Sequence, residues 1–363
     1  MDLTTTILLD GLTFPECPRW HEGALWFSDV HAHTIIRMTP DGRAQRVIEN
    51  AHQPAGLGWL PNGDLLYVRM VDRTLVRVAQ PPFEESPGRP PAESSDTGDV
   101  AQPSFEESPG RPAVLSSDKT VPESGAKDGS PPPFEESPRR PPANGPDPMI
   151  ADLTHLEPVQ LNDMTVDRNG RAYIGGFGFD INKGDPFATS SIYLLDLRDG
   201  ARAPSPANSA DTTSAPTTPQ IAAGNMRFPN GMVVTPDGLT LIAAETVGRS
   251  LTAFDIDARG ALTNRREWAA LPVFPDGICL DAENAVWVAS PTTGECLRVR
   301  EGGEITDKVK SHARGVYACM LGGESGRTLY LCTANTTGPE LAQGISTGWI
   351  EQVEVEVPHA GLP

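Results

Sequence analysis

The strongest constraint on the fold is a unit that recurs along the chain. "RFPNGMVVTPDGLTLIAAET" (227–246) and "VFPDGICLDAENAVWVAS" (273–290) share one layout: a polar residue before Gly, an apolar run, a turn and a second apolar run. The step is 46 residues from Asn230 to Asp276 and 42 residues from Asp276 to Ala318. A period of this length, filled with short strands, is typical of β-propeller blades.

Six segments follow the plan of polar loop, short apolar strand, turn and second strand: residues 14–30, 53–70, 160–176, 228–245, 274–290 and 317–333. A third β-rich run follows each segment, and a weaker fourth run, such as 44–49 or 265–270, usually follows that one. The turns "PNGD", "DRNG", "TPDG" and "DAEN" carry the Asn, Asp or Gly that hairpins with positive φ need. No segment keeps a 3.6-residue apolar period, so we expect little helix. The sequence therefore predicts an all-β fold: a six-bladed β-propeller with four-stranded antiparallel blades.

Two stretches interrupt this single propeller, which we expect to span residues 1–363. Residues 80–148 are rich in Pro, Ser and Glu and contain "FEESP" three times, and residues 201–219 form a shorter stretch of the same kind. Such sequences cannot bury enough apolar area to offset chain entropy, so we predict two disordered insertions. Each follows a third-strand run and should leave the rim of the propeller, away from its channel. The repeats are either neutral low-complexity sequence or a docking segment for a protein partner.

Composition narrows the function classes. The net charge of −19 argues against binding to nucleic acid or to an anionic membrane surface, both of which need a basic face. The five cysteines are odd in number and lie mostly in apolar runs, which predicts buried free thiols in a reducing compartment. Cys17, which we place in a loop, could alternatively be a nucleophile. Without a signal-like or membrane-spanning run, we expect a cytoplasmic location.

Polar residues stand where the innermost strand of a blade would begin. Four of these six positions carry a side-chain oxygen: Glu16, Asn162, Asn230 and Asp276. The other two are Ala55–Gly56 and Tyr317–Ala318. Ring closure would gather two carboxylates and two amides at one mouth of the channel, which suits Ca²⁺, Mg²⁺ or Mn²⁺ better than a structural zinc. Each position alone could instead be a plain Asn-Gly, Asp-Gly or Asx turn.

The motifs "FPECPRW", "LNDMTVDRNGRAYIG", "RFPNGMVVTPDG", "FPDGICLDAENAVWVA" and "ACMLGG" together resemble the regucalcin/gluconolactonase family, which includes luciferin-regenerating enzymes. The resemblance covers nearly everything outside the two insertions. It implies a six-bladed propeller with one divalent cation in its channel, and it assigns ligands to Glu16, Asn230 and Asp276. Asn162 looks like a further ligand or a substrate contact. Calcium is the favoured ion, with Zn²⁺, Mg²⁺, Mn²⁺ and Fe²⁺ as alternatives.

The chain departs from the family pattern at two positions beside these ligands. Gln160 stands where regucalcin-like members carry an Arg that contacts sugar-lactone hydroxyls, which argues against a sugar lactone. Cys17 stands where members usually carry Gly or Ser, and we expect it to alter the mouth without removing a ligand.

Family members are typically lactonases, so the resemblance implies a metal-dependent hydrolase that opens a lactone or related ester with water. We expect Asp276 to act as the base as well as a ligand, with Asp163 as second candidate. Arg19, Gln160, Asn162 and Asp163 are the expected substrate contacts. Two alternatives stay open: a phosphotriesterase-like hydrolase on the same scaffold, and a non-catalytic binding platform.

Overall fold

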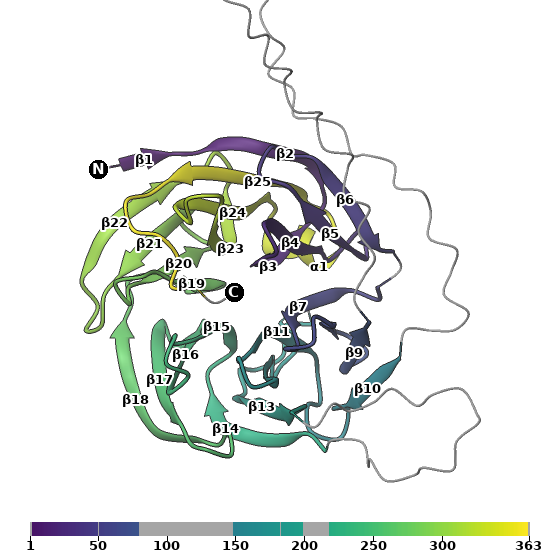
Figure 1. Cartoon of the computed structure of the whole chain (residues 1–363). Coiled ribbons are helices and arrows are strands. Elements are labelled where there is room, and N and C mark those ends of the chain that lie inside the picture. Colours follow the sequence, from purple (N-terminus) through teal and green to yellow (C-terminus); the bar gives the residue numbers. More distant parts are fainter. Residues whose placement is uncertain (1, 50, 80–147, 182, 199–217, 362–363) are drawn as a thin grey trace, which may run out of the picture. The chain divides into compact units, whose positions relative to one another are not determined.

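The computed structural model describes residues 2–49, 51–79, 148–181, 183–198 and 218–361. Almost all of both predicted insertions, 80–148 and 201–219, therefore lies outside the described residues. The described residues form six sheets arranged in a ring, which confirms the six-bladed β-propeller (Figure 1). Five sheets have four strands and one has five.

The first three blades follow the chain in order, each from its innermost to its outermost strand. Blade one consists of β3 (Pro15–His21), β4 (Ala24–Asp29), β5 (Thr34–Met38) and β6 (Ala44–Ile48). Blade two consists of β7 (Pro54–Trp59), β8 (Leu65–Arg69), β9 (Thr74–Val78) and β10 (Met149–Asp152). Blade three consists of β11 (Leu161–Val166), β12 (Arg171–Gly176), β13 (Ser190–Asp196) and β14 (Gln220–Met226).

The last three blades continue the ring. Blade four consists of β15 (Pro229–Val234), β16 (Thr240–Glu245), β17 (Ser250–Ile256) and β18 (Leu262–Ala270). Blade five contains β19 (Ile278–Leu280), β20 (Val286–Ser290), β21 (Glu295–Val299) and β22 (Ile305–Lys310). Blade six contains β23 (Gly315–Gly322), β24 (Thr328–Asn335) and β25 (Thr347–Glu354), and the short helix α1 (Gly338–Ala342) lies between its last two strands.

The N-terminal strands join the first part of the chain to the last two blades. β2 (Thr6–Leu12) pairs antiparallel with β25 and is the outermost strand of blade six. β1 (Asp2–Thr4) pairs parallel with β22 and adds a fifth strand to blade five. Our expectation of four antiparallel strands per blade therefore holds for five blades, and the fifth blade differs because the N-terminus reaches past blade six.

The hydrophobic core lies between neighbouring blades. One buried cluster, for example, joins Leu9 of β2, Phe27 of β4, Trp287 of β20 and Tyr330 of β24. The innermost strands β3, β7, β11, β15, β19 and β23 contact one another in a closed ring around the channel. The five cysteines are all free and buried, as predicted.

The turns between the first and second strands adopt the conformation that their residues predict. Gly63, Gly170 and Gly238 have φ between 75° and 85°, and Asn284 has φ 60°. Because each blade is antiparallel, the connection from strand two to strand three lies at the end where strand one begins. We call this end the channel mouth. The connections from strand three to strand four lie at the opposite end in the blades where the structure describes them.

Within the described part of the chain, α1 is the only α-helix, so the helix content is low as expected. No helix there has the length and apolar character that a membrane crossing requires.

Candidate active site at the channel mouth

Irregular backbone marks the start of the innermost strands. Five of the six pair with the second strand through a register shift, which lies at residues 16–19, 54–57, 161–164, 229–232 and 316–318. A bulge leaves extra residues out of the ladder and re-aims their side chains. Three of these shifts contain predicted ligand positions, Glu16, Asn162 and Asn230, whereas Asp276 lies just before β19, which pairs without a shift.

Glycines next to these positions let neighbouring blades approach closely. A Cβ on Gly231 would lie 2.5 Å from the Ile278 nitrogen, and one on Gly277 would lie 2.5 Å from the Ala318 Cβ. The Gly231 N–H donates to the Asp276 carbonyl at 3.3 Å, and the Gly277 N–H donates to the Tyr317 carbonyl at 2.8 Å. Asn230-Gly231 and Asp276-Gly277 are therefore contacts between blades rather than plain turns.

Asp276 and Asn230 lie side by side at the mouth. Burial, then repulsion from Asp163, raises the pKa of Asp276 to about 8, although a hydrogen bond from the Asn230 side chain acts in the opposite direction. The Asn230 amide nitrogen also donates to Thr246 Oγ1 at 3.3 Å. Since donation occupies this nitrogen, the Asn230 oxygen is the group available as an acceptor.

Glu16 belongs to the same electrostatic cluster. Burial raises its pKa well above the usual range, and repulsion from Asp276 and Asp163 raises it further. The Cys17 N–H donates to Glu16 Oε2 at 3.2 Å. Cys17 lies in β3 rather than in a loop, with φ 51°, and burial raises the pKa of its thiol, which argues against the alternative of a nucleophile.

Asp163 forms a buried ion pair with Arg19. The Arg19 Nη2 lies 2.8 Å from Asp163 Oδ1 and also donates to the Met164 carbonyl, while Nη1 donates to the Pro18 carbonyl at 2.8 Å. Only 5% of Arg19 and 4% of Asp163 is exposed. These contacts hold the Asp163 carboxylate in place, whereas the substrate contact that we predict for Arg19 stays a prediction.

Asn162 and Gln160 flank the start of β11. Asn162 is buried, and its amide nitrogen donates to the Pro229 carbonyl of the next blade at 3.3 Å. Gln160 is half-buried just before the strand, and its carbonyl accepts from the Phe177 N–H at 2.9 Å. Both residues lie at the mouth, and their roles as ligand or substrate contact stay predictions.

Tyr317 is a member of the site to which the sequence analysis gave no role. Burial raises the pKa of its hydroxyl, and the negative charges of Asp276 and Glu16 raise it further. Its ring packs edge-on against Phe14, with ring centres 4.7 Å apart. The sequence did contain a signal for Tyr317, namely its position at the start of the sixth innermost strand. We gave it no role because only carboxylate and amide side chains were considered as ligands.

The residues fit a hard divalent cation by their chemistry. Burial raises the pKa values of the Glu16 and Asp276 carboxyls. Repulsion from Asp276 raises that of Glu16 further, and repulsion from Asp163 raises that of Asp276, which is a condition that a positive charge would relieve. No cluster of three or more His, Cys, Asp or Glu among the described residues is arranged to bind a metal. A cation held here would therefore also need amide oxygens, as Asn230 and Asn162 supply.

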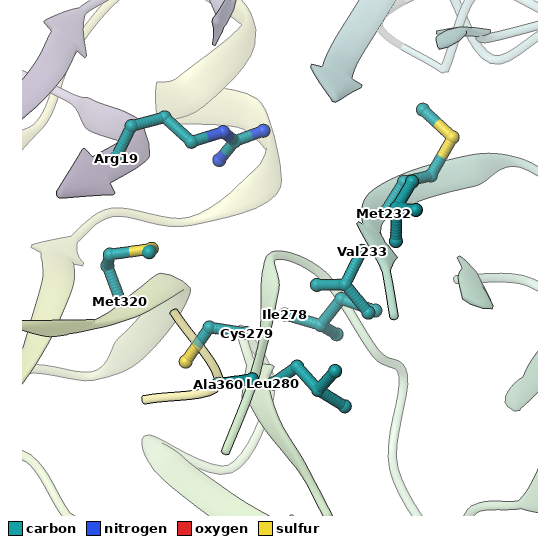
Figure 2. A pocket seen from close by; sticks show the side chains of 9 residues that line it. Arg19, Met232, Val233, Ile278, Cys279, Leu280, Met320 and Ala360 are labelled. Carbon is teal, nitrogen blue, oxygen red and sulfur yellow. The ribbon is translucent and has the colours of Figure 1, made fainter. Parts of the chain in front are cut away.

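A separate, mostly apolar pocket lies farther along the innermost strands. Figure 2 shows it lined by side chains that include Arg19, Met232, Ile278 and Met320, with Ala360 near the C-terminus. Its lining lacks the clustered carboxylates of the mouth. We therefore place the chemistry at the mouth and not in this pocket.

Curated proteins with similar sequences include a 6-deoxy-6-sulfogluconolactonase of Pseudomonas putida, 29% identical over 40% of this chain and 52% of that protein. Regucalcin of Danio rerio is 31% identical over 29% of this chain and 37% of that protein. This chain therefore spans about half or less of the curated relatives it matches.

Solved structures share the fold over nearly the whole chain. A luciferin-regenerating enzyme has a TM-score of 0.64 at 15% identity, covering 98% of this chain and 97% of that one. A calcium-binding protein, regucalcin, from Agrobacterium tumefaciens has a TM-score of 0.61 at 15% identity, covering 100% and 99%. Residues 14–85 and 142–335 match the family described as SMP-30/Gluconolactonase/LRE-like region. These matched residues form well over half of the chain, which belongs to this family.

Proposed function

We propose that this protein is a divalent-cation-dependent hydrolase that opens a lactone, or a related ester, with water at the channel mouth. The observation that carries the proposal is the pair of repelling carboxylates, Glu16 and Asp276, set beside two amides where the blades of a gluconolactonase-family propeller converge. A relative named as a sulfogluconolactonase supports the reaction class.

Glu16, Asn230 and Asp276, with Asn162, would hold the cation, for which we propose Ca²⁺. A divalent cation at such a site polarises a carbonyl and makes a nearby water more acidic. Asp276 would accept the proton of the attacking water and return it to the alkoxide that leaves as the ring opens. Without a cation, burial raises the pKa of Asp276 to about 8, and a bound cation would favour the ionised carboxylate that this role requires.

Two further side chains would shape the reaction. Arg19 holds the Asp163 carboxylate in a fixed orientation through the 2.8 Å contact, so Asp163 is the second candidate for the base. Tyr317 stays protonated because burial, and then the negative charges of Asp276 and Glu16, raise the pKa of its hydroxyl. A neutral phenol can donate a hydrogen bond to the oxyanion that forms when water attacks.

The test is hydrolysis by protein stripped of metal with a chelator and then supplied with Ca²⁺ or another divalent cation. The panel contains sugar lactones, alkyl lactones, aryl esters and a phosphotriester. We expect cation-dependent opening of at least one lactone, and a loss of at least 100-fold in kcat for Asp276→Asn. Hydrolysis of the phosphotriester alone would reassign the reaction, and an Asp276→Asn variant with full activity would refute the catalytic assignment.

A further inference from the structure

Exposed apolar side chains gather at the channel mouth. Among the described residues, nine large apolar side chains are exposed. Five of them lie on loops at the mouth: Val71, Ile181, Phe187, Phe274 and Ile345. The other four lie on outer strands or at the opposite end: Ile7, Met149, Ile221 and Leu239. We call the first five the apolar rim. Exposed apolar side chains that gather at one end of a protein, beside polar groups, are a feature of binding sites.

Backbone hydrogen bonds fasten the rim loops to the segments that begin the innermost strands. The Phe177 N–H donates to the Gln160 carbonyl at 2.9 Å, and the Thr246 N–H donates to the Phe228 carbonyl at 3.0 Å. The Met70 N–H donates to the Gln53 carbonyl at 3.0 Å. The loops that follow the second strands therefore stand directly around the candidate catalytic residues.

An aromatic wall connects the rim with the site on the side of blades three and four. Phe187, which is 46% exposed, packs edge-on against Phe179 with ring centres 5.5 Å apart. Phe179 packs against Phe228 at 5.7 Å, and Phe177 packs edge-on against Phe228 at 4.6 Å. Phe228 lies two residues before Asn230. Its φ of 68° is costly for a bulky residue, and such strain is often kept at functional sites.

A second apolar wall stands on the side of blades one and six. Phe14 and Tyr317 form a buried cluster against which Met70 and Leu341 pack. The Tyr317 carbonyl accepts a hydrogen bond from the Gly277 N–H at 2.8 Å, which places this wall next to Asp276. The two walls thus flank the carboxylates from different blades.

Polar side chains on the rim loops already have partners. Lys183 forms an ion pair with Asp180 of its own loop at 2.8 Å. The Arg249 guanidinium donates to the Pro272 carbonyl and lies 5.3 Å from the centre of the Phe274 ring. These groups would lose existing contacts if they turned to bind a hydroxylated substrate, whereas the apolar side chains of the rim keep at least 40% of their surface exposed.

We propose that the substrate is a lactone that carries an apolar substituent, an alkyl chain or an aromatic ring, which lies against the apolar rim while the ring ester faces the carboxylates. This inference rests on the proposed function. Apolar lining fixed by a few polar groups is how small-molecule sites select their ligands. A polyhydroxylated lactone would lose water from its hydroxyls at this rim without replacement hydrogen bonds.

The experiment compares a series of γ-lactones whose side chain grows from none to butyl, with protein supplied with excess Ca²⁺. Since each methylene that is covered by protein adds about two- to fourfold in affinity, kcat/KM should rise roughly tenfold or more from γ-butyrolactone to γ-octalactone. Glucono-δ-lactone should be the poorer substrate. A kcat/KM that is flat or falls along the series while γ-butyrolactone is opened would overturn the inference and leave the proposed function standing.

Matched variants and a binding measurement separate the two claims. Phe187→Ser should lower the kcat/KM ratio of octalactone to butyrolactone about threefold or more, whereas Leu239→Ser, which changes an exposed apolar side chain at the opposite end, should keep the wild-type ratio. Titration calorimetry with the butyl-substituted γ-lactam measures binding without turnover. Tighter binding to wild type than to Phe187→Ser supports the rim even if no lactone is hydrolysed. Equal binding to wild type and both variants would refute it.

Discussion

Asp276→Asn should make the cation-free protein more stable at neutral and alkaline pH. The pKa of Asp276 is raised from 3.8 to about 8 by burial and by repulsion from Asp163. The native state therefore keeps a proton that the unfolded chain releases, so stability falls as pH rises from about 4 to about 8. Asparagine has nearly the same shape and does not ionise, and this loss should disappear in the variant.

The size of the effect follows from the two pKa values. Between pH 6 and pH 8 the unfolded carboxyl is fully ionised while the native one titrates only near pH 8, which removes about 2 kcal/mol of unfolding free energy. Urea denaturation in the presence of a chelator, followed by circular dichroism at pH 6, 7 and 8, measures this slope. Saturating Ca²⁺ should stabilise wild type more strongly at pH 8 than at pH 6, because the cation competes with the proton.

The control is Asp10→Asn, which removes the same charge from an exposed side chain of β2. This control corrects for the general effect of removing one negative charge from a chain whose net charge is −19. We expect Asp10→Asn to keep the wild-type slope and Asp276→Asn to flatten it by about 2 kcal/mol over this range. If the unfolding free energy depended on pH in the same way in all three proteins, the pKa of Asp276 would not be raised in the folded state. That result would contradict the proposed cation site.

Three further substitutions test the residues that support the site, and the free energy of unfolding is measured for each by chemical denaturation. Arg19→Met should cost about 3–5 kcal/mol, because it leaves the buried Asp163 carboxylate without its partner, and a loss below 1 kcal/mol would contradict the ion pair. Gly277→Ala should cost more than ~2 kcal/mol, since its Cβ would collide with the next blade, whereas Gly338→Ala, which meets nothing within 4 Å, should stay within about 0.5 kcal/mol. Leu9→Ala should cost about 2–5 kcal/mol, and a neutral result would mean that β2 does not fasten blade six.

The blades could be predicted because their signals are local. An apolar run, a turn with Asn or Gly and a second apolar run lie within twenty residues, and the third run at 34–38 coincides with β5 (Thr34–Met38). The predicted ligand positions also lie together at the mouth, because a period of strands fixes where each innermost strand begins. Glu16 and Asp276 are 260 residues apart in the chain, yet in the folded state burial, and then repulsion from Asp276, raise the pKa of Glu16.

The remaining features depend on contacts that no local pattern encodes. The pairing of β2 with β25 joins the two ends of the described chain, and no feature of the sequence "TILLDGL" identifies β25 as the strand with which it pairs. The Arg19–Asp163 ion pair links blades one and three in the same way. The sequence did not identify Tyr317 as a site residue because its neighbours in the chain are apolar. Only the closed ring brings its hydroxyl near Asp276 and Glu16, whose charges add to the effect of burial on its pKa.

The glycines that close the ring also place the carboxylates. Gly231 and Gly277 allow adjacent innermost strands to touch, and that contact brings the Asp276 carbonyl within hydrogen-bond reach of Gly231. A residue with a Cβ at either position would collide with the neighbouring blade. The repeat therefore does two things at once: its apolar part builds the blades, and its glycine lets adjacent blades approach so closely that the buried Asp276 lies beside Asn230 at the mouth. Burying a carboxyl whose pKa is raised to about 8 costs stability at neutral pH, and such a cost is common at functional sites.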